Sequence, residues 1–401
     1  MNRYSLKRLW QVMKNQYHLL IAIFANIYYG FPSKKLKVIG VTGTDGKTTT
    51  THLIYHILKS TGKKASMIST VYAQIGKKQY DTGFHVTTPS AFTVQKLIFE
   101  AYKAGSEFFV LELTSHRLEQ NQLWGIKFEI GVLTNITHEH LDYHGTYEEY
   151  CKAKLKLLSN SRVAVVNEDD ESYKIVQSSR QKGGQAPFKV QSYNSKFKGL
   201  EKFLELTKFN RYNYAAAYTV CKELEIEGKN IFKAMKTFQL PKGRWDLVYD
   251  KDFKVMIDFA HTSNAFLQLL PEVRKKYLDK TGRIIHVFGA AGLRDKSKRY
   301  SMGKISATYS DVIILTEEDY RIENLYKICE QIGNGIKSVH KSYTIIENRL
   351  DAIKKAISIA LLGDIVVLTG KAHEKSLCRG KIEYPWDEKE AVEKIIKSLI
   401  K

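Results

Sequence analysis

The chain has 401 residues, more than one hydrophobic core usually organises, and its 43% hydrophobic and 11% aromatic content is typical of two or three folded domains and excludes extended disorder. Lys+Arg 63 against Asp+Glu 42 gives 63 − 42 = +21, but the basic residues are spread over the whole chain, so a nucleic-acid partner is not expected and a lysine-rich surface or anionic small substrates explain the charge better. The four cysteines are far apart, which argues against a disulfide framework or a thiolate zinc site and favours the cytoplasm.

The N-terminal segment, residues 1–35, is basic and then apolar. Arg3, Lys7, Arg8 and Lys14 precede an apolar stretch at residues 18–30. This stretch is shorter than the roughly 20 residues needed to span a bilayer, and it contains Asn26. We expect a helix that packs on the body of the protein, and weak attachment to a membrane surface is the alternative.

The next segment, residues 36–240, alternates short apolar runs with helical patterns. We expect helices at residues 47–60, 146–158 and 210–224 and strands at the intervening apolar runs, 36–41, 108–113, 130–134 and 162–166. The pattern weakens through a polar stretch from 170 to about 207. Strands alternating with helices predict a mainly parallel sheet covered on both faces.

A second α/β domain is expected in residues 241–401, after a hinge at residues 241–243 (Pro-Lys-Gly). Four buried-strand runs separated by helical segments follow the hinge, at residues 255–259, 284–288, 312–316 and 365–369. This spacing predicts a Rossmann-like domain.

The strongest local motif is a glycine-rich loop at residues 38–50 (VIGVTGTDGKTTT), between the first strand and its helix. Backbone N–H groups and the start of a helix hold phosphate at such a turn. Lys47 is expected to neutralise the β- and γ-phosphates and Thr48 to bind Mg²⁺. The spacing departs from the strict P-loop pattern because Val41 occupies the first glycine position, so an ordinary glycine turn is the competing interpretation.

Acidic and histidine residues follow two later strands. Glu112 ends one strand and His140 lies in the loop after the next, where both could bind a hard cation together with Thr48. Two other interpretations stay open at this point. His138, His140 and His144 could form a zinc or manganese site, or these histidines could simply cap loops.

In their order along the chain, the motifs resemble the Mur ligases, and among them the MurE branch, which adds the third residue of the peptidoglycan stem. They are GTDGKTT at residues 43–49, ELTSHRLEQ at 112–120, TNITHEHLDYHG at 134–145, YCKAKLKLL at 150–158, VFGAAGLRDKSKR at 287–299 and GKAHE at 370–374. The resemblance implies a P-loop-type ATPase domain with a C-terminal Rossmann-like domain. It also implies an ATP- and Mg²⁺-dependent ligase that joins an amino acid, diaminopimelate or lysine, to a muramyl-peptide carboxylate through an acyl-phosphate.

The resemblance also assigns residues by position. It implies catalytic roles for Lys47, Glu112, His140 and Lys154, and Mg²⁺ binding by Thr48, Glu112, His140 and a carbamylated Lys154. ATP would be bound by Gly43, Thr44, Asp45, Gly46, Lys47, Thr48, Thr49, Asn135, Asn213, Arg244 and Asp258. The acceptor would contact Thr87, Thr88 and Ser115, and the amino acid Arg294, Glu318, Asp319, Arg321, Gly370 and Glu374.

Several departures concern the acceptor and the amino acid rather than ATP. Only 35 residues precede the first strand, where the family has a UDP-binding domain, and residues 120–125 (QNQLWG) lack the expected arginine. Tyr320 stands where the amino-acid motif has proline. A UDP-linked or a lipid-linked acceptor therefore remains open. A ligase like folylpolyglutamate synthase and a non-catalytic ATP-binding protein are the rival functions.

Overall fold

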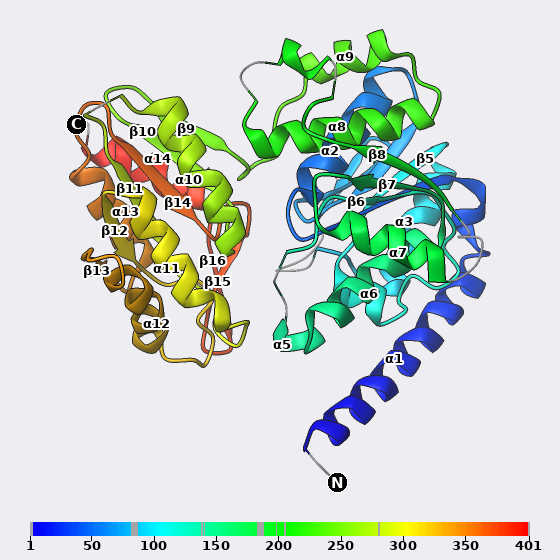
Figure 1. Ribbon diagram of the computed structural model, residues 1–401, viewed down its shortest axis with the longest axis horizontal. Coiled ribbons are helices and arrows are strands. Elements are labelled where there is room, and N and C mark those ends of the chain that lie inside the picture. Colours follow the sequence, from blue (N-terminus) through cyan, green and yellow to red (C-terminus); the bar gives the residue numbers. More distant parts are fainter. Residues whose placement is uncertain are drawn as a thin grey trace. The chain divides into compact units, whose positions relative to one another are not determined.

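The computed structural model describes residues 3–81, 87–137, 139, 141–182, 188–197, 199–203, 206–279 and 281–399. The chain divides into two compact units (Figure 1). Unit 1 comprises residues 1–138 and 144–239, and unit 2 comprises residues 139–143 and 240–401.

Unit 1 is built on an eight-stranded sheet in the order β4-β3-β2-β5-β1-β6-β7-β8. Its strands are β1 (Lys37–Thr42), β2 (Ala65–Ile68), β3 (Ala73–Ile75), β4 (Lys78–Tyr80), β5 (Phe108–Glu112), β6 (Phe128–Leu133), β7 (Ser161–Asn167) and β8 (Lys189–Tyr193). The central strand β1 pairs in parallel with β5 and β6, whereas β3 and β4 form an antiparallel edge. The carboxyl ends of β1, β5 and β6 therefore lie at one edge of the sheet.

Helices cover both faces of this sheet. They are α1 (Arg3–Tyr28), α2 (Lys47–Ser60), α3 (Ala91–Lys103), α4 (Ser115–Glu119), α5 (Leu141–His144, assigned to unit 2 except for its last residue), α6 (Tyr147–Ser159), α7 (Ser172–Lys182), α8 (Lys208–Glu223) and α9 (Gly228–Lys236), with the 3₁₀ turns η1 (Pro32–Lys35) and η2 (Leu200–Lys202). Successive side chains of β1 point to opposite faces of the sheet and so belong to two hydrophobic clusters. Ile39 packs toward α2 and α8, and Val38 packs toward α3 and α6.

Unit 2 has a six-stranded sheet in the order β13-β12-β11-β14-β10-β9 and a separate hairpin. The strands are β9 (Asp246–Asp250), β10 (Lys254–Asp258), β11 (Ile284–Phe288), β12 (Val312–Leu315), β13 (Thr344–Ile345) and β14 (Ile365–Thr369), with β15 (Ser376–Arg379) and β16 (Ile382–Pro385) in the hairpin. One face packs on α10 (Ser263–Tyr277), α11 (Ser297–Tyr309) and α12 (Leu325–Lys337), and the other on α13 (Arg349–Ser358) and α14 (Glu388–Leu399).

The predicted α/β class and the predicted strands and helices are present, with ends shifted by at most two residues. No helix or strand was predicted in the polar stretch after residue 170, but the structure has α7, β8 and η2 there. Strand β8 has a half-exposed alternation, and only Tyr193 is fully buried in it, so its hydrophobic pattern is weak. The antiparallel strand β9 and the β15–β16 hairpin were also not predicted.

The N-terminal helix α1 packs on unit 1, as expected. Ala22 and Ala25 are buried, and Asn26 Nδ2 donates to the carbonyl of Trp124 at 2.7 Å. Nearer the N-terminus, Asn15 Nδ2 donates to Glu119 in α4 at 2.6 Å. In the part of the chain that the structure describes, no helix has the length and apolar character required to cross a membrane.

Candidate active site

The glycine-rich loop connects β1 to α2 and requires glycine at two positions. Gly43 has φ +153°, and a Cβ there would lie 1.8 Å from Thr134 Oγ1. Gly46, the N-cap residue of α2, has φ +83°, and a Cβ there would lie 2.4 Å from Asn213 Oδ1. The loop can therefore wrap closely over the start of α2, where N–H groups bind anions.

The segment after β6 fixes this loop by hydrogen bonds. Asn135 clamps Asp45 from both sides, since Asp45 N donates to Asn135 Oδ1 at 2.9 Å and Asn135 Nδ2 donates to Asp45 O at 3.1 Å. Thr134 Oγ1 also donates to Asp45 O, at 2.6 Å. Thr44 Oγ1 lies 3.0 Å from the Tyr150 hydroxyl. These hydrogen bonds hold the loop in shape.

Lys47 and Thr49 occupy the first turn of α2. The Lys47 ammonium folds back onto its own loop, donating to Gly43 O at 3.1 Å and to Thr44 O at 2.7 Å. Thr49 is buried. Asn213 in α8 lies beside this turn, accepting a 3.3 Å hydrogen bond from Thr50 Oγ1.

Glu112, at the end of β5, is 1% exposed and points to α2. Its Oε1 accepts from Thr48 Oγ1 at 2.8 Å and from Thr70 Oγ1 at 2.8 Å, and its Oε2 accepts from Thr70 N at 2.8 Å. All three donors are neutral. A buried carboxylate held by neutral groups is costly, and a cation bound beside it would offset that cost.

Lys154, in α6, is likewise 1% exposed and lies next to the loop. Its Nζ donates to Gly43 O at 2.6 Å and lies 4.5 Å from the centre of the Tyr150 ring. Lys47 and Lys154 therefore share the carbonyl of Gly43. Thr48, Glu112 and Lys154, which are distant in the sequence, converge around the glycine-rich loop.

The predicted acceptor residues lie at the same edge of the sheet. Thr88 Oγ1 donates to Glu112 O at 3.0 Å and accepts from Thr114 N. Ser115 Oγ lies 3.0 Å from His144 Nε2. Burial, reinforced by the charge of Lys154, lowers the pKa of His144 to about 4, so this imidazole is neutral at pH 7. Thr87 is half-buried.

His138 and His140 lie outside the described residues, so the predicted metal-binding role of His140 stays a prediction. The alternative zinc or manganese site of His138, His140 and His144 includes the same two residues, so it also stays a prediction. Among the residues that the structure describes, no three His, Cys, Asp or Glu side chains gather in a way that could hold a metal ion. His144, the described member of that trio, instead contacts Ser115.

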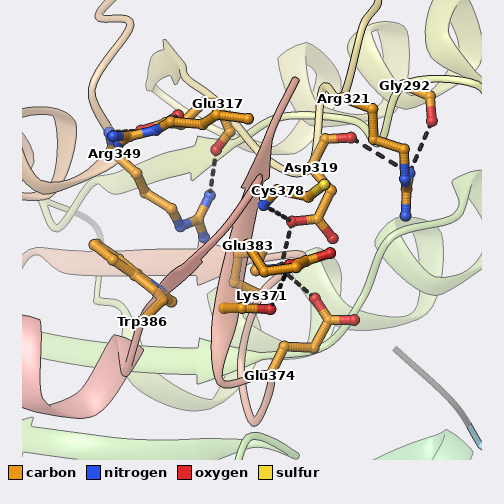
Figure 2. A network of polar contacts seen from close by, with 12 residues as sticks. Gly292, Glu317, Asp319, Arg321, Arg349, Lys371, Glu374, Cys378, Glu383 and Trp386 are labelled. Carbon is orange, nitrogen blue, oxygen red and sulfur yellow. Dashed lines mark hydrogen bonds and ion pairs between the residues drawn. The ribbon is translucent and has the colours of Figure 1, made fainter. Parts of the chain in front are cut away.

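In unit 2, two of the predicted amino-acid residues, Asp319 and Glu374, bind a buried lysine that sequence reasoning missed (Figure 2). Lys371 Nζ donates to Asp319 Oδ1 at 2.8 Å and to Glu374 Oε2 at 2.5 Å. Burial alone would lower the pKa of Lys371, but the charges of Glu374 and Asp319 raise it on balance. Asp319 also accepts from Cys378 N at 2.9 Å.

Two further predicted residues adjoin this group. Arg321 Nη1 donates to Gly292 O at 2.8 Å, which fixes the guanidinium beside Asp319 (Figure 2). Glu318 is buried next to Gly370, where a Cβ would lie 2.6 Å from Glu318 Oε2. Burial raises the pKa of Glu318, and the charge of Asp319 adds to the effect. Arg294 is exposed in the loop before α11.

The other two predicted ATP residues, Arg244 and Asp258, also lie in unit 2. The Arg244 guanidinium stacks on Phe259, 4.5 Å from its ring centre. Asp258 accepts from Trp245 N at 2.7 Å and from Ala260 N at 2.8 Å. Burial raises the pKa of Asp258, although the charge of Arg244 opposes the shift. Their assignment to ATP stays a prediction.

Three residues of these sites were missed from the sequence. Tyr150 and Lys371 stand inside quoted motifs, YCKAK and GKAHE, but a tyrosine or lysine there carries no evident chemistry until its contacts are known. Thr70 lies just after β2, outside every motif, and only the fold brings it to Glu112.

Comparison with known families matches both units. The family model described as "Mur ligase middle domain" matches residues 41–214, and the one described as "Mur ligase, glutamate ligase domain" matches residues 243–372.

Among curated relatives, the UDP-N-acetylmuramoyl-L-alanyl-D-glutamate–2,6-diaminopimelate ligase of Aquifex aeolicus is 38% identical over 93% of this chain and 80% of its own length. A ligase of the same name from Clostridium acetobutylicum, its ligase 1, is 35% identical over 94% of this chain and 82% of its own. The UDP-N-acetylmuramyl-tripeptide synthetase of Borreliella afzelii is 37% identical, with 94% and 80% covered.

Solved structures show the same fold. A UDP-N-acetylmuramoyl-L-alanyl-D-glutamate–2,6-diaminopimelate ligase is 27% identical with a TM-score of 0.58, covering 91% of this chain and 79% of its own. The folylpolyglutamate synthase of Mycobacterium tuberculosis, complexed with ADP and AMPPCP, has a higher TM-score of 0.69 over 88% of this chain and 92% of its own, but only 13% identity. The latter likeness indicates the fold alone.

Proposed function

Because the chain belongs to the Mur ligase family of ATP-dependent ligases, we propose that it joins an amino acid to the carboxylate of a UDP-linked muramyl peptide in peptidoglycan synthesis, releasing ADP and phosphate. The observation that carries this proposal is the convergence of Thr48, Glu112 and Lys154 on one glycine-rich loop. The names of relatives 35–38% identical over nearly the whole chain support the muramyl-peptide acceptor.

ATP is proposed to bind with its phosphates over the glycine-rich loop. The N–H groups at the start of α2 and the Lys47 ammonium supply positive charge to the β- and γ-phosphates. In the structure Lys47 is bound to the carbonyls of Gly43 and Thr44, so it must exchange these for phosphate oxygens. The remaining residues predicted to bind ATP in unit 1 form the loop or lie beside the start of α2: Thr44, Asp45, Thr49, Asn135 and Asn213.

The chemistry of the site also fits Mg²⁺. Glu112 and the Thr48 hydroxyl offer hard oxygen ligands, and His140 and a carbamylated Lys154 would complete the set proposed from the resemblance. The buried carboxylate held by neutral donors is the observation that favours a cation here. When bound, Mg²⁺ neutralises charge on the transferring phosphoryl group.

The reaction proceeds in two displacements. First, an oxygen of the acceptor carboxylate, positioned by Thr87, Thr88 and Ser115, attacks the γ-phosphorus and the bond to the β-phosphate oxygen breaks, giving an acyl-phosphate and ADP. Then the neutral amine of the amino acid attacks the acyl carbon, phosphate departs and the nitrogen loses a proton, giving the amide. Exclusion of water during the second step protects the acyl-phosphate from hydrolysis.

The amino acid is proposed to bind in unit 2, where Arg294, Glu318, Asp319, Arg321, Gly370 and Glu374 were predicted. Diaminopimelate fits best, because the fixed guanidinium of Arg321 can bind a distal carboxylate and the nearby acidic groups an ammonium. The names of two relatives support it as well. Lysine, which lacks that carboxylate, is the second candidate.

We place the reaction in the cytoplasm. Cys151, Cys221, Cys329 and Cys378 are all buried free thiols, which suits a reducing compartment. An ATP-consuming synthesis also requires the compartment that supplies nucleotide.

The test is a product assay with purified protein, ATP and Mg²⁺. ADP and phosphate should appear only when UDP-linked muramyl dipeptide and diaminopimelate are both present. AMP and pyrophosphate as products, or ADP release with a folate acceptor alone, would refute the proposal. Assays with lysine in place of diaminopimelate, on the unchanged protein and on Arg321→Ala, show which amino acid the site prefers. The variant should raise the KM for diaminopimelate at least about tenfold and leave the KM for lysine nearly unchanged.

A further inference from the structure

Helix α1 has one face that packs on unit 1 and an opposite face that is mostly exposed, although Phe24 on that face still reaches the Phe92 ring of α3. Its packed face includes the buried residues Ala22, Ala25 and Asn26, and Tyr29 contacts the Phe92 ring of α3. The hydrogen bond from Asn15 to Glu119 holds the helix farther toward its N-terminus. These contacts fix the rotation of α1 about its own axis, so the opposite face is presented to the exterior.

The opposite face carries a continuous stripe of large apolar side chains at alternating intervals of three and four residues. This apolar stripe consists of Trp10 (58% exposed), Met13 (56%), Tyr17 (62%), Leu20 (65%), Phe24 (61%) and Ile27 (62%). Six large apolar residues on one face of one helix form the kind of patch that soluble surfaces usually lack. Figure 1 shows α1 at the lower right, with its first turns reaching beyond the rest of unit 1.

The charge of α1 indicates what kind of surface the stripe contacts. The helix contains Arg3, Lys7, Arg8 and Lys14 but no acidic residue, and the exposed Lys34 and Lys35 follow it. A partner for this helix must therefore accept apolar side chains and carry negative charge. Both features belong to the headgroup region of an anionic bilayer.

We propose that α1 binds the surface of an anionic membrane, lying in its plane with the apolar stripe inserted and the exposed Lys14, Lys34 and Lys35 among the lipid phosphates. Trp10 and Tyr17 are the residue types that prefer the bilayer interface, and Leu20, Phe24 and Ile27 supply the apolar area. The proposal concerns an attachment surface and does not depend on the proposed ligase reaction.

A second copy of the chain is the less suitable occupant. The three-four spacing matches a coiled-coil seam, but such a seam favours aliphatic residues, and here Trp10, Tyr17 and Phe24 occupy three successive equivalents of one position, with Arg3 at the equivalent before them. Paired α1 helices would each bring four positive charges and no acidic residue for salt bridges between them.

The experiment is co-sedimentation of the full chain with vesicles of phosphatidylglycerol and phosphatidylcholine, compared with phosphatidylcholine alone. Binding should require the anionic lipid and weaken as salt is raised, because charge and apolar insertion act together. A blue shift of tryptophan emission should accompany binding and should be lost in Trp10→Phe, which leaves the other three tryptophans in place.

Two matched pairs of variants test the surface. Leu20→Ser with Ile27→Ser should lower vesicle partitioning at least about tenfold, whereas Leu362→Ser, at a position 81% exposed in unit 2, should not. Lys14→Glu should weaken binding to anionic vesicles more than Lys63→Glu, which changes the net charge equally at another exposed site.

The outcomes are distinguishable. Equal binding to both vesicle types, equal losses in the test and control variants, or no binding at low salt would overturn the proposal. A concentration-dependent dimer that Leu20→Ser with Ile27→Ser converts to monomer, with no vesicle binding, would assign the stripe to a second copy instead. ADP formation measured without vesicles reports the ligase reaction separately, and the stripe variants should leave it unchanged.

Discussion

The two units bury charge in different ways. In unit 1 the carboxylate of Glu112 is buried among the neutral hydroxyl and N–H groups of Thr48 and Thr70. In unit 2 two buried cations meet opposite charges: Arg349 binds Glu388, and Lys371 binds Asp319 and Glu374 (Figure 2). Among the described residues, the carboxylate of Glu112 accepts hydrogen bonds from neutral donors, whereas the cations Arg349 and Lys371 are each neutralised by acidic partners.

This contrast distinguishes a proposed ligand-binding residue, Glu112, from a structural ion pair, Arg349–Glu388. Removing one member of a buried ion pair is strongly destabilising because it leaves the other charge buried and unpaired, so the Arg349–Glu388 pair is expected to hold α13 to α14. A buried carboxylate with neutral donors is costly to hold without a cation beside it, and Glu112 is proposed to bind one. The same residue type therefore has opposite expected effects when it is neutralised in the two units.

The largest expected effect concerns Lys154. Lys154→Ala should lower the rate of ADP formation about 1,000-fold or more, because it removes the group proposed to complete the metal site beside the loop. Lys152→Ala, at an exposed lysine two residues earlier in α6 that pairs with Glu149, should stay within about twofold. Steady-state kinetics on both variants decides the matter, and an active Lys154→Ala would remove this lysine from the mechanism.

Breaking the buried pair of unit 2 should mainly cost stability. Glu388→Gln leaves Arg349 buried without its anion, which should destabilise unit 2 by about 3–5 kcal/mol. Glu390→Gln, in the exposed pair with Lys394 on the same helix, should cost less than about 1 kcal/mol. Denaturant unfolding measures both, and equal midpoints for the two variants would mean that the buried pair is not a fixture.

Neutralising Glu112 in unit 1 should lower activity rather than stability. Glu112→Gln should lower turnover about 100-fold without lowering the unfolding midpoint. The new amide oxygen can accept from Thr70 N, and the threonine hydroxyls can rotate to accept from its NH₂ group. A large loss of stability in this variant would contradict the view that Glu112 is buried for a ligand.

The smallest expected effect concerns Thr70, which orients Glu112. Thr70→Val removes the hydroxyl donor but keeps the backbone N–H bond, so the Mg²⁺ concentration for half-maximal activity should rise about tenfold. Thr70→Ser should restore it. A titration with Mg²⁺ at saturating ATP gives the answer, and a change confined to stability would leave Thr70 a purely structural residue.

Much of the fold could be predicted because its strands are buried on both faces. β11 and β14 were predicted to the residue, since a parallel strand under two helical layers is a continuous apolar run. β8 and β9 escaped because their half-exposed positions interrupt that run. The helix starts predicted at Thr146 and Lys47 lie within one residue of the observed starts of α6 and α2.

Candidate site residues could be predicted where they belong to a sequence motif, but not where only the pairing of distant strands brings them to the site. Glu112 and Lys154 were assigned through family motifs, and their contacts with Thr48 and Gly43 agree with one shared location. Thr70 reaches Glu112 only because β2 pairs with β5, a pairing that no local pattern specifies. The identity of Lys371 as the centre of the unit 2 network likewise depends on tertiary contacts.

The carbonyl oxygen of Gly43 receives the ammonium groups of both Lys47 and Lys154. In the proposed mechanism, arrival of a triphosphate would draw Lys47 away and conversion of Lys154 to a carbamate would remove its positive charge, so each event would release the same acceptor atom. If both events occur as proposed, the two lysines are linked through one oxygen, and occupancy of the nucleotide site should change how readily Lys154 takes up carbon dioxide.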